Sequence, residues 1–175
     1  MTEQPRVLAG RRALVTGGAG GLGRAFARAL ALHGSDVAIL DIDPQVERYT
    51  VELEASGVRA FAIRADISNP DEALLGVERS AALMGGLDIV VNNAAVVRVT
   101  RPLEDDFAAA LADFESVVSV NLRGTYLVGR AAISHLARRG GHIVNITTDH
   151  VHTCGYPVAI DHADAPLCPL SLIHI

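Results

Sequence analysis

The sequence contains neither lysine nor tryptophan, and its fifteen basic residues are all arginine. Chemistry that depends on a lysine side chain is therefore excluded within these 175 residues. Cysteine is scarce as well, because only Cys154 and Cys168 occur. Two cysteines are too few for a disulfide framework and are usual in a reducing compartment, so we expect a cytoplasmic protein.

The chain also lacks a basic stripe and a long apolar run. Its net charge is −5 and its arginines are interleaved with carboxylates, which argues against nucleic acid and against a membrane surface as partners. Nowhere do about eighteen apolar residues follow one another, and residues 1–15 have no apolar signal core. A small-molecule partner is the expectation that remains.

What the sequence does contain is a regular alternation of two patterns. Short apolar or β-branched runs occur at 12–17, 36–41, 59–66, 87–94 and 141–148. Longer stretches with apolar residues at helical spacing occur at 21–34, 44–57, 69–86 and 105–139. This alternation predicts right-handed βαβ crossovers, and hence an α/β fold whose doubly wound parallel sheet is covered by helices on both faces. We place this domain at residues 1–150, followed by an irregular tail at 151–175.

A glycine-rich turn, "TGGAGGLG", connects the first predicted strand to the first predicted helix. It fits both Gly-x-Gly-x-x-Gly and Thr-Gly-x-x-x-Gly-x-Gly. Glycines let the backbone turn tightly and approach a pyrophosphate, to which the helix N-terminus offers free N–H groups. Such turns also serve as plain strand-to-helix connections. The candidate cofactor-binding residues of the turn are Thr16, Gly17, Gly18, Gly20, Gly21, Leu22 and Gly23.

An acidic residue ends the second predicted strand, about twenty residues beyond the turn. There the Asp41 carboxylate can accept hydrogen bonds from the adenosine ribose of NAD, and it would repel the 2'-phosphate of NADP. Its neighbours Ile42, Asp43 and Pro44 supply no cation for that phosphate, so we expect NAD, bound beside Asp41 and Ile42. The alternative is that Asp41 caps the helix beginning near Pro44, a role that Asp43 fills equally well.

With Thr16-Gly17-x-x-x-Gly21-x-Gly23, "NNAA" at 92–95 and Asn121 in "VNLRGTY", the chain resembles the short-chain dehydrogenase/reductase family over residues 10–150. The resemblance implies a Rossmann-type sheet in the order 3-2-1-4-5, with further strands after the fifth. It also implies hydride transfer between a nicotinamide and an alcohol or ketone, and a full-length homo-oligomer formed through the long helix of residues 113–139.

The resemblance also assigns roles to single residues. Asp66, followed by Ile67, matches the acidic residue that binds the adenine amino group, although a helix cap is the alternative for Asp66. The loop of Asn93, Ala94 and Ala95 would run beside the cofactor ribose, and Ala95 stands where the family commonly has glycine.

Two more residues match the catalytic positions of the family. Asn121 is implied to support a proton-relay water, and Thr148 stands where a serine hydroxyl orients the substrate oxygen. Thr147 remains an alternative, because alternation along the strand directs the two side chains to opposite faces.

The Tyr-x-x-x-Lys pair of the family is absent. Tyr156 has Ile160 four residues on, and no lysine occurs anywhere. We therefore expect a fragment that stops before its catalytic helix and is inactive by itself. The alternative is a non-catalytic dinucleotide-binding module. A metal site is a further alternative that we do not favour, and the residues for it would be His150, His152, Cys154, Asp161, His162 and Cys168.

Overall fold

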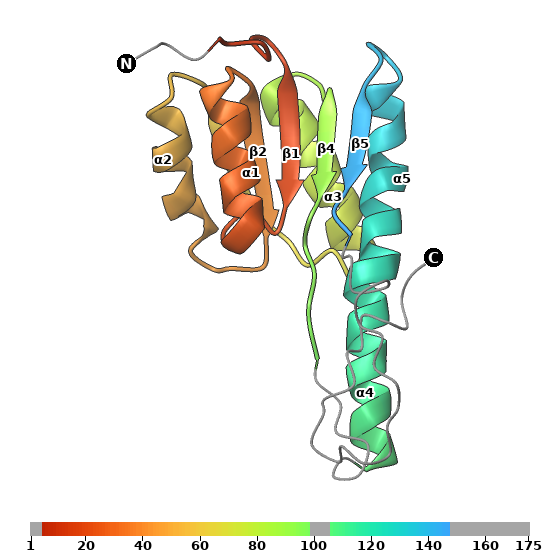
Figure 1. Cartoon of the computed structure of the whole chain (residues 1–175). Coiled ribbons are helices and arrows are strands. Elements are labelled where there is room, and N and C mark those ends of the chain that lie inside the picture. The colour runs from red at the N-terminus through yellow and green to blue at the C-terminus, as the bar shows by residue number, and fades with distance from the viewer. Residues whose placement is uncertain (1–4, 99–105, 148–175) are drawn as a thin grey trace. The chain divides into compact units, whose positions relative to one another are not determined.

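The structure, a computed structural model, describes residues 5–98 and 106–147 (Figure 1). In chain order its elements are β1 (Arg12–Thr16), α1 (Gly21–Leu32), β2 (Asp36–Asp41), the short 3-10 helix η1 (Val46–Tyr49), α2 (Thr50–Glu54), β3 (Ala60–Arg64), α3 (Pro70–Met84), β4 (Ile89–Asn92), α4 (Phe107–Val117), the π-helical segment η2 (Val118–Gly124), α5 (Thr125–Leu136) and β5 (His142–Asn145). The chain divides into two compact units, 1–94 with 124–146 and 95–123 with 147–175.

The first unit contains a parallel sheet in the order β3-β2-β1-β4-β5, which confirms the predicted doubly wound topology. The chain runs outward from β1 to β2 and β3, and then crosses back to add β4 and β5 on the other side. In such sheets ligands bind at the carboxyl ends of the strands, at the point where the direction of winding reverses. That point lies here between β1 and β4.

The core of this unit forms where β1 and β2 are buried between two helical layers. Figure 1 shows α1 and α2 in front of the sheet and α3 behind it, and α3 packs against α5. On the α1 side, strand residues such as Val15 and Ile39 pack with Ala27 and Ala31 of the helix. The small alanines let α1 lie close to the sheet, which fixes the position of its N-terminus above the end of β1.

The fifth strand differs from the prediction of a sheet covered on both faces. All four residues of β5 are exposed, and Ile143 and Val144 retain 39% and 46% of their accessible surface. Within the described residues β5 pairs only with β4 and forms the edge of the sheet. Its apolar residues therefore do not indicate burial on both faces.

The helical pattern of 105–139 is likewise not one continuous α-helix. It consists of α4, the π-helical η2 and α5, and α4 and most of η2 belong to the second unit. Gly124 ends η2, and a Cβ there would lie 2.8 Å from side-chain atoms of Ile67, so glycine allows the backbone to approach the loop after β3.

An ionic cluster closes the opposite end of the sheet, where the strands begin. Asp88, 1% exposed, accepts hydrogen bonds from Arg12 Nε at 2.7 Å, Arg12 Nη2 at 3.1 Å and the Arg12 backbone N–H at 3.0 Å. Arg11 and Arg139 lie within 3.8 Å of the same carboxylate. The Arg12 guanidinium holds the pKa of the Asp88 carboxyl below its ordinary value, chiefly through these hydrogen bonds. The cluster ties the start of β1 to the start of β4.

Candidate functional site

The glycine turn lies at the carboxyl end of β1 and is shaped by contacts that exclude side chains. A Cβ on Gly23 would lie 2.0 Å from the carbonyl oxygen of Gly17, and a Cβ on Gly17 would lie 2.8 Å from the Cα of Ala94. A Cβ on Gly18 would meet Ile39 at 2.7 Å. At these three positions another part of the same chain lies too close for a Cβ. Glycine is therefore required, and the contacts give the turn a defined form.

Gly20 and Gly21 are different, because a Cβ on either would have no atom of the described residues within 4 Å beyond its own neighbours in the chain. Gly21 adopts φ +50°, which favours glycine, and Gly20 caps α1 without a side-chain hydrogen bond. The first turn of α1 also contains no acidic residue. The turn thus leaves open space and uncapped helix N–H groups on its outer side, which fits an anionic group such as a pyrophosphate.

Thr16 joins this turn to the loop after β4. Its buried hydroxyl oxygen accepts hydrogen bonds from the backbone N–H groups of Asn93 and Ala94, both at 3.0 Å. In return, Asn93 Nδ2 donates to the carbonyl oxygens of Thr16 at 3.1 Å and Gly17 at 3.3 Å. The predicted residues Thr16, Gly17, Asn93 and Ala94 therefore form one hydrogen-bonded group at the switch point of the sheet.

Asp41 ends β2 beside the glycine turn. Its Oδ2 accepts from the backbone N–H of Ala19 at 2.9 Å, and its Oδ1 accepts from Asp43 N–H at 3.0 Å. Asp43, and not Asp41, accepts from the N–H of Gln45 at the start of η1, which decides against the capping role considered for Asp41. Each carboxylate oxygen retains acceptor capacity, so Asp41 can hold the turn and still accept from a ribose hydroxyl.

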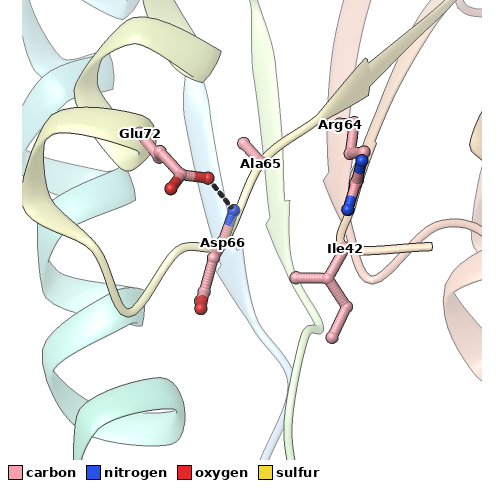
Figure 2. Close-up of a pocket in the computed structure, with 5 residues that line it drawn as sticks. All are labelled: Ile42, Arg64, Ala65, Asp66 and Glu72. Carbon is pink, nitrogen blue, oxygen red and sulfur yellow. Dashed lines mark hydrogen bonds between the residues drawn. The ribbon is translucent and has the colours of Figure 1, made fainter. Parts of the chain in front are cut away.

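An open pocket of about 600 Å³ lies beyond the ends of β2 and β3. It is lined by Ile42, Arg64, Ala65, Asp66 and Glu72, and Figure 2 shows Arg64 next to Ile42, and Glu72 next to Asp66. Glu72 Oε2 accepts from the backbone N–H of Asp66 at 2.9 Å. The exposed side chain of Ile42 offers an apolar contact to an aromatic ring, and the two carboxylates can accept hydrogen bonds from its N–H groups.

Asp66 does not cap α3, although its position in the sequence left that role open as an alternative. The cap is Asn69, whose side chain accepts from the N–H groups of Asp71 and Glu72. Asp66 Oδ1 accepts from Ser68 N–H at 2.8 Å, and Oδ2 has no bond to another described residue. The neighbouring Ile67 is buried and is not among the residues that line the pocket.

The comparisons with known proteins agree with this geometry. The family model described as short chain dehydrogenase matches residues 11–158. The chain belongs to the short-chain dehydrogenase family. Oxidoreductase UcpA of Escherichia coli (strain K12) is 34% identical over 144 residues, which cover 81% of this chain and 52% of that protein. Cis-4-hydroxycyclohexanecarboxylate dehydrogenase of Sinomonas cyclohexanicum is 36% identical over 139 residues, 79% of this chain and 55% of that one.

Solved structures lead to the same family. A short chain dehydrogenase from Burkholderia cenocepacia J2315, crystallised in complex with NADP, is similar with a TM-score of 0.76 and 37% identity. The match covers 83% of this chain and 58% of that one. The chain therefore spans about half the length of the curated relatives it matches.

Of the two predicted catalytic residues, Asn121 and Thr148, the structure describes Asn121. In the second unit Asn121, within η2 and half-buried, accepts from Val96 N–H at 2.9 Å and donates to the Val96 carbonyl at 3.0 Å. Ala95, next to Val96, is exposed. Thr148 lies outside the described residues, as do all the residues considered for a metal site.

Two pocket residues, Arg64 and Glu72, are absent from the sequence prediction. Glu72 could be found only by expecting α3 to fold back onto the loop after β3, and Arg64 only from the register of β3 against β2. Among residues 5–98 and 106–147 there is no group of three or more His, Cys, Asp or Glu side chains that could hold a metal ion. The same part of the chain contains no helix long and apolar enough to cross a membrane.

Proposed function

We propose that this chain is the dinucleotide-binding part of a short-chain dehydrogenase that transfers hydride between a nicotinamide cofactor and an alcohol or ketone. The observation that carries the proposal is the hydrogen-bonded group of Thr16, Gly17, Asn93 and Ala94 beside the open outer side of Gly20 and Gly21. The pyrophosphate of the cofactor would bind at the N-terminus of α1, and adenosine would bind in the pocket lined by Ile42 and Asp66.

We further propose that NAD is preferred over NADP. Asp41 is an anion held at the place where the ribose would lie, because its carboxylate is bonded to Ala19 of the glycine turn. It would accept hydrogen bonds from the ribose hydroxyls and repel a 2'-phosphate. The relative from Burkholderia cenocepacia was crystallised with NADP, so cofactor preference has to be measured on this chain.

Bound nicotinamide would supply the hydride chemistry. Of the residues present, Thr148 would position the substrate oxygen. Asn121 would support a water, because its amide can still donate and accept hydrogen bonds beyond those it makes with Val96. The sequence has no lysine, and so no Tyr-x-x-x-Lys pair. We therefore expect these 175 residues to bind cofactor without turnover, which is also what a non-catalytic dinucleotide-binding module would do.

Isothermal titration calorimetry with NADH and NADPH tests this proposal, since the absence of tryptophan leaves little protein fluorescence to quench. We expect NADH to bind at least tenfold more tightly than NADPH, and Asp41→Asn to reduce that ratio to about threefold. Asp36→Asn, at the other end of β2, is the matched control and should leave the ratio unchanged. Absence of binding by either cofactor would refute the proposed function, and equal affinities would refute the preference.

A homo-oligomer is the partner that we propose for the complete protein. Phe107, Leu111 and Phe114 follow one another at helical spacing on α4 and are exposed, Phe107 by 84%. Residues at such spacing form one apolar face, which a second copy would cover. Sedimentation velocity should give a dimer or tetramer, and Phe107→Ser with Phe114→Ser should shift it toward the monomer. An unchanged mass for this variant would contradict the proposal.

A further inference from the structure

Arg64 lies on the same face of the sheet as Asp41. The two residues are paired in the parallel register of β2 and β3, Asp41 opposite Arg64. Side chains of residues directly paired in a sheet point to the same face. Because Asp41 is directed to the glycine turn through Ala19, Arg64 leaves the sheet toward the side where the ribose of a bound dinucleotide would lie.

Arg64 is also the one cation among the five residues that line the pocket. Its side chain is exposed and, within the described residues, forms no hydrogen bond or ion pair. Three other arginines of the first unit, in contrast, bind carboxylates: Arg12 binds Asp88, Arg24 binds Glu52 and Arg59 binds Asp36. The Arg64 guanidinium therefore has no partner among the described residues, whereas the Asp41 carboxylate is bonded to the glycine turn.

We propose that Arg64 is a specificity-determining residue of the adenosine site and gives it affinity for a 2'-phosphate, which Asp41 opposes. The inference rests on the proposed function. A guanidinium presents paired N–H donors that match a phosphate, and its positive charge attracts the phosphate. The same charge adds little to the binding of an uncharged ribose hydroxyl. Arg64 therefore strengthens NADPH binding selectively, and the balance between Arg64 and Asp41 sets the preference of the site.

The competing role for Arg64 is stacking on the adenine ring beside Ile42, where Figure 2 shows it. Adenine is the same in both cofactors, so stacking would strengthen NADH and NADPH binding equally. The two roles are distinguished by whether substitution changes the ratio of the two affinities or only their common level.

The test is calorimetric titration of the full chain with NADH and NADPH, for wild type and Arg64→Gln. We expect Arg64→Gln to weaken NADPH binding about tenfold and NADH binding less than twofold. Arg79→Gln removes the same charge from an exposed position of α3 about 10 Å along the helix from Glu72, and should change neither affinity. Raising the salt concentration should reduce the effect on NADPH, because exposed charges are screened.

Asp41→Asn provides a second background in case the affinity of the wild type for NADPH is too low to measure. There NADPH should bind measurably, and adding Arg64→Gln should abolish that gain. The inference is overturned if Arg64→Gln weakens both cofactors equally, if NADPH affinity does not change, or if Asp41→Asn gains no affinity for NADPH. If wild type binds neither cofactor, the proposed function fails together with the Arg64 assignment. If wild type binds NADH but Arg64→Gln gives one of the results above, only the Arg64 assignment fails.

Discussion

Gly23→Ala should damage the cofactor site and the fold together. The added Cβ would lie 2.0 Å from the Gly17 carbonyl oxygen and 2.5 Å from Asn93 Nδ2. Attractive contacts between heavy atoms are optimal at about 3.5 Å, so the helix and the turn must separate by more than 1 Å. One obstacle is backbone and the other is the side chain that bonds Thr16 and Gly17, so neither can simply rotate away.

The cost follows from these contacts. Overpacking of a well-packed site costs about 1–3 kcal/mol, and the backbone clash puts Gly23→Ala near the upper end of that range. In a chain of this size each kcal/mol lowers Tm by about 2–4 °C, which gives an expected decrease of about 6–12 °C. Displacement of the turn from the N-terminus of α1 should also weaken NADH binding at least tenfold.

The assays are a thermal melt followed by circular dichroism and calorimetric titration with NADH. Gly129→Ala is the matched control: its Cβ would lie 3.8 Å from Ile143 Cδ1, an ordinary contact, and Gly129 lies within α5. Replacing a helical glycine by alanine should stabilise by about 0.5–1 kcal/mol and leave NADH binding unchanged. A Gly23→Ala protein with wild-type Tm and wild-type NADH affinity would refute the assignment of the turn.

Three further predictions concern the scaffold of the site. Asp88→Asn leaves the Arg12 guanidinium without its carboxylate and should cost about 3 kcal/mol in urea denaturation at pH 7. Because the fold lowers the pKa of Asp88, its contribution is complete above about pH 4 and is lost as pH falls further, so the difference between wild type and variant should shrink below pH 4. Thr16→Val leaves the N–H groups of Asn93 and Ala94 without their acceptor and should cost about 2–4 kcal/mol, whereas Thr16→Ser should cost less than half as much; equal losses would contradict this. Val144→Lys places a charge on the exposed edge strand β5 and should slow aggregation measured by light scattering, and unchanged aggregation would show that this edge is not responsible.

The position of the glycine turn could be predicted from local signals, and the sheet order from the family resemblance that those signals carry. The alternation of strand and helix patterns, together with the resemblance carried by Thr16 to Gly23, predicts the order that the structure has. The loop of Asn93 and Ala94 follows in the same way, since β4 must lie beside β1. Each of these predictions depends on short motifs, whose residues are close in sequence, and on the family resemblance that they carry.

Other features depend on relations that no local pattern contains. The change from α-helical to π-helical backbone at η2 has no propensity signal, because the low helix propensity of Val, Ser and Asn in VSVNLRG does not distinguish a π-helical turn from an α-helical one. The exposure of β5 depends on what lies beside it, because its Ile143 and Val144 are residues of the same types that are buried in β2 and β4. Apolar character is a poor indicator of burial at the edge of a sheet.

Cofactor preference shows the same limit at the level of one side chain. A sequence prediction considers the residues that follow Asp41, and among Ile42, Asp43 and Pro44 there is no cation. The cation that we propose to affect the preference comes from the neighbouring strand, 23 positions later, because Arg64 is the register partner of Asp41. In a parallel sheet, therefore, the residue opposite the acidic end of the second strand has to be included before an acidic side chain is taken to exclude a 2'-phosphate. Here that residue is a guanidinium without a partner in the described chain, so in our proposal the preference of the site depends on two opposing charges and not on Asp41 alone.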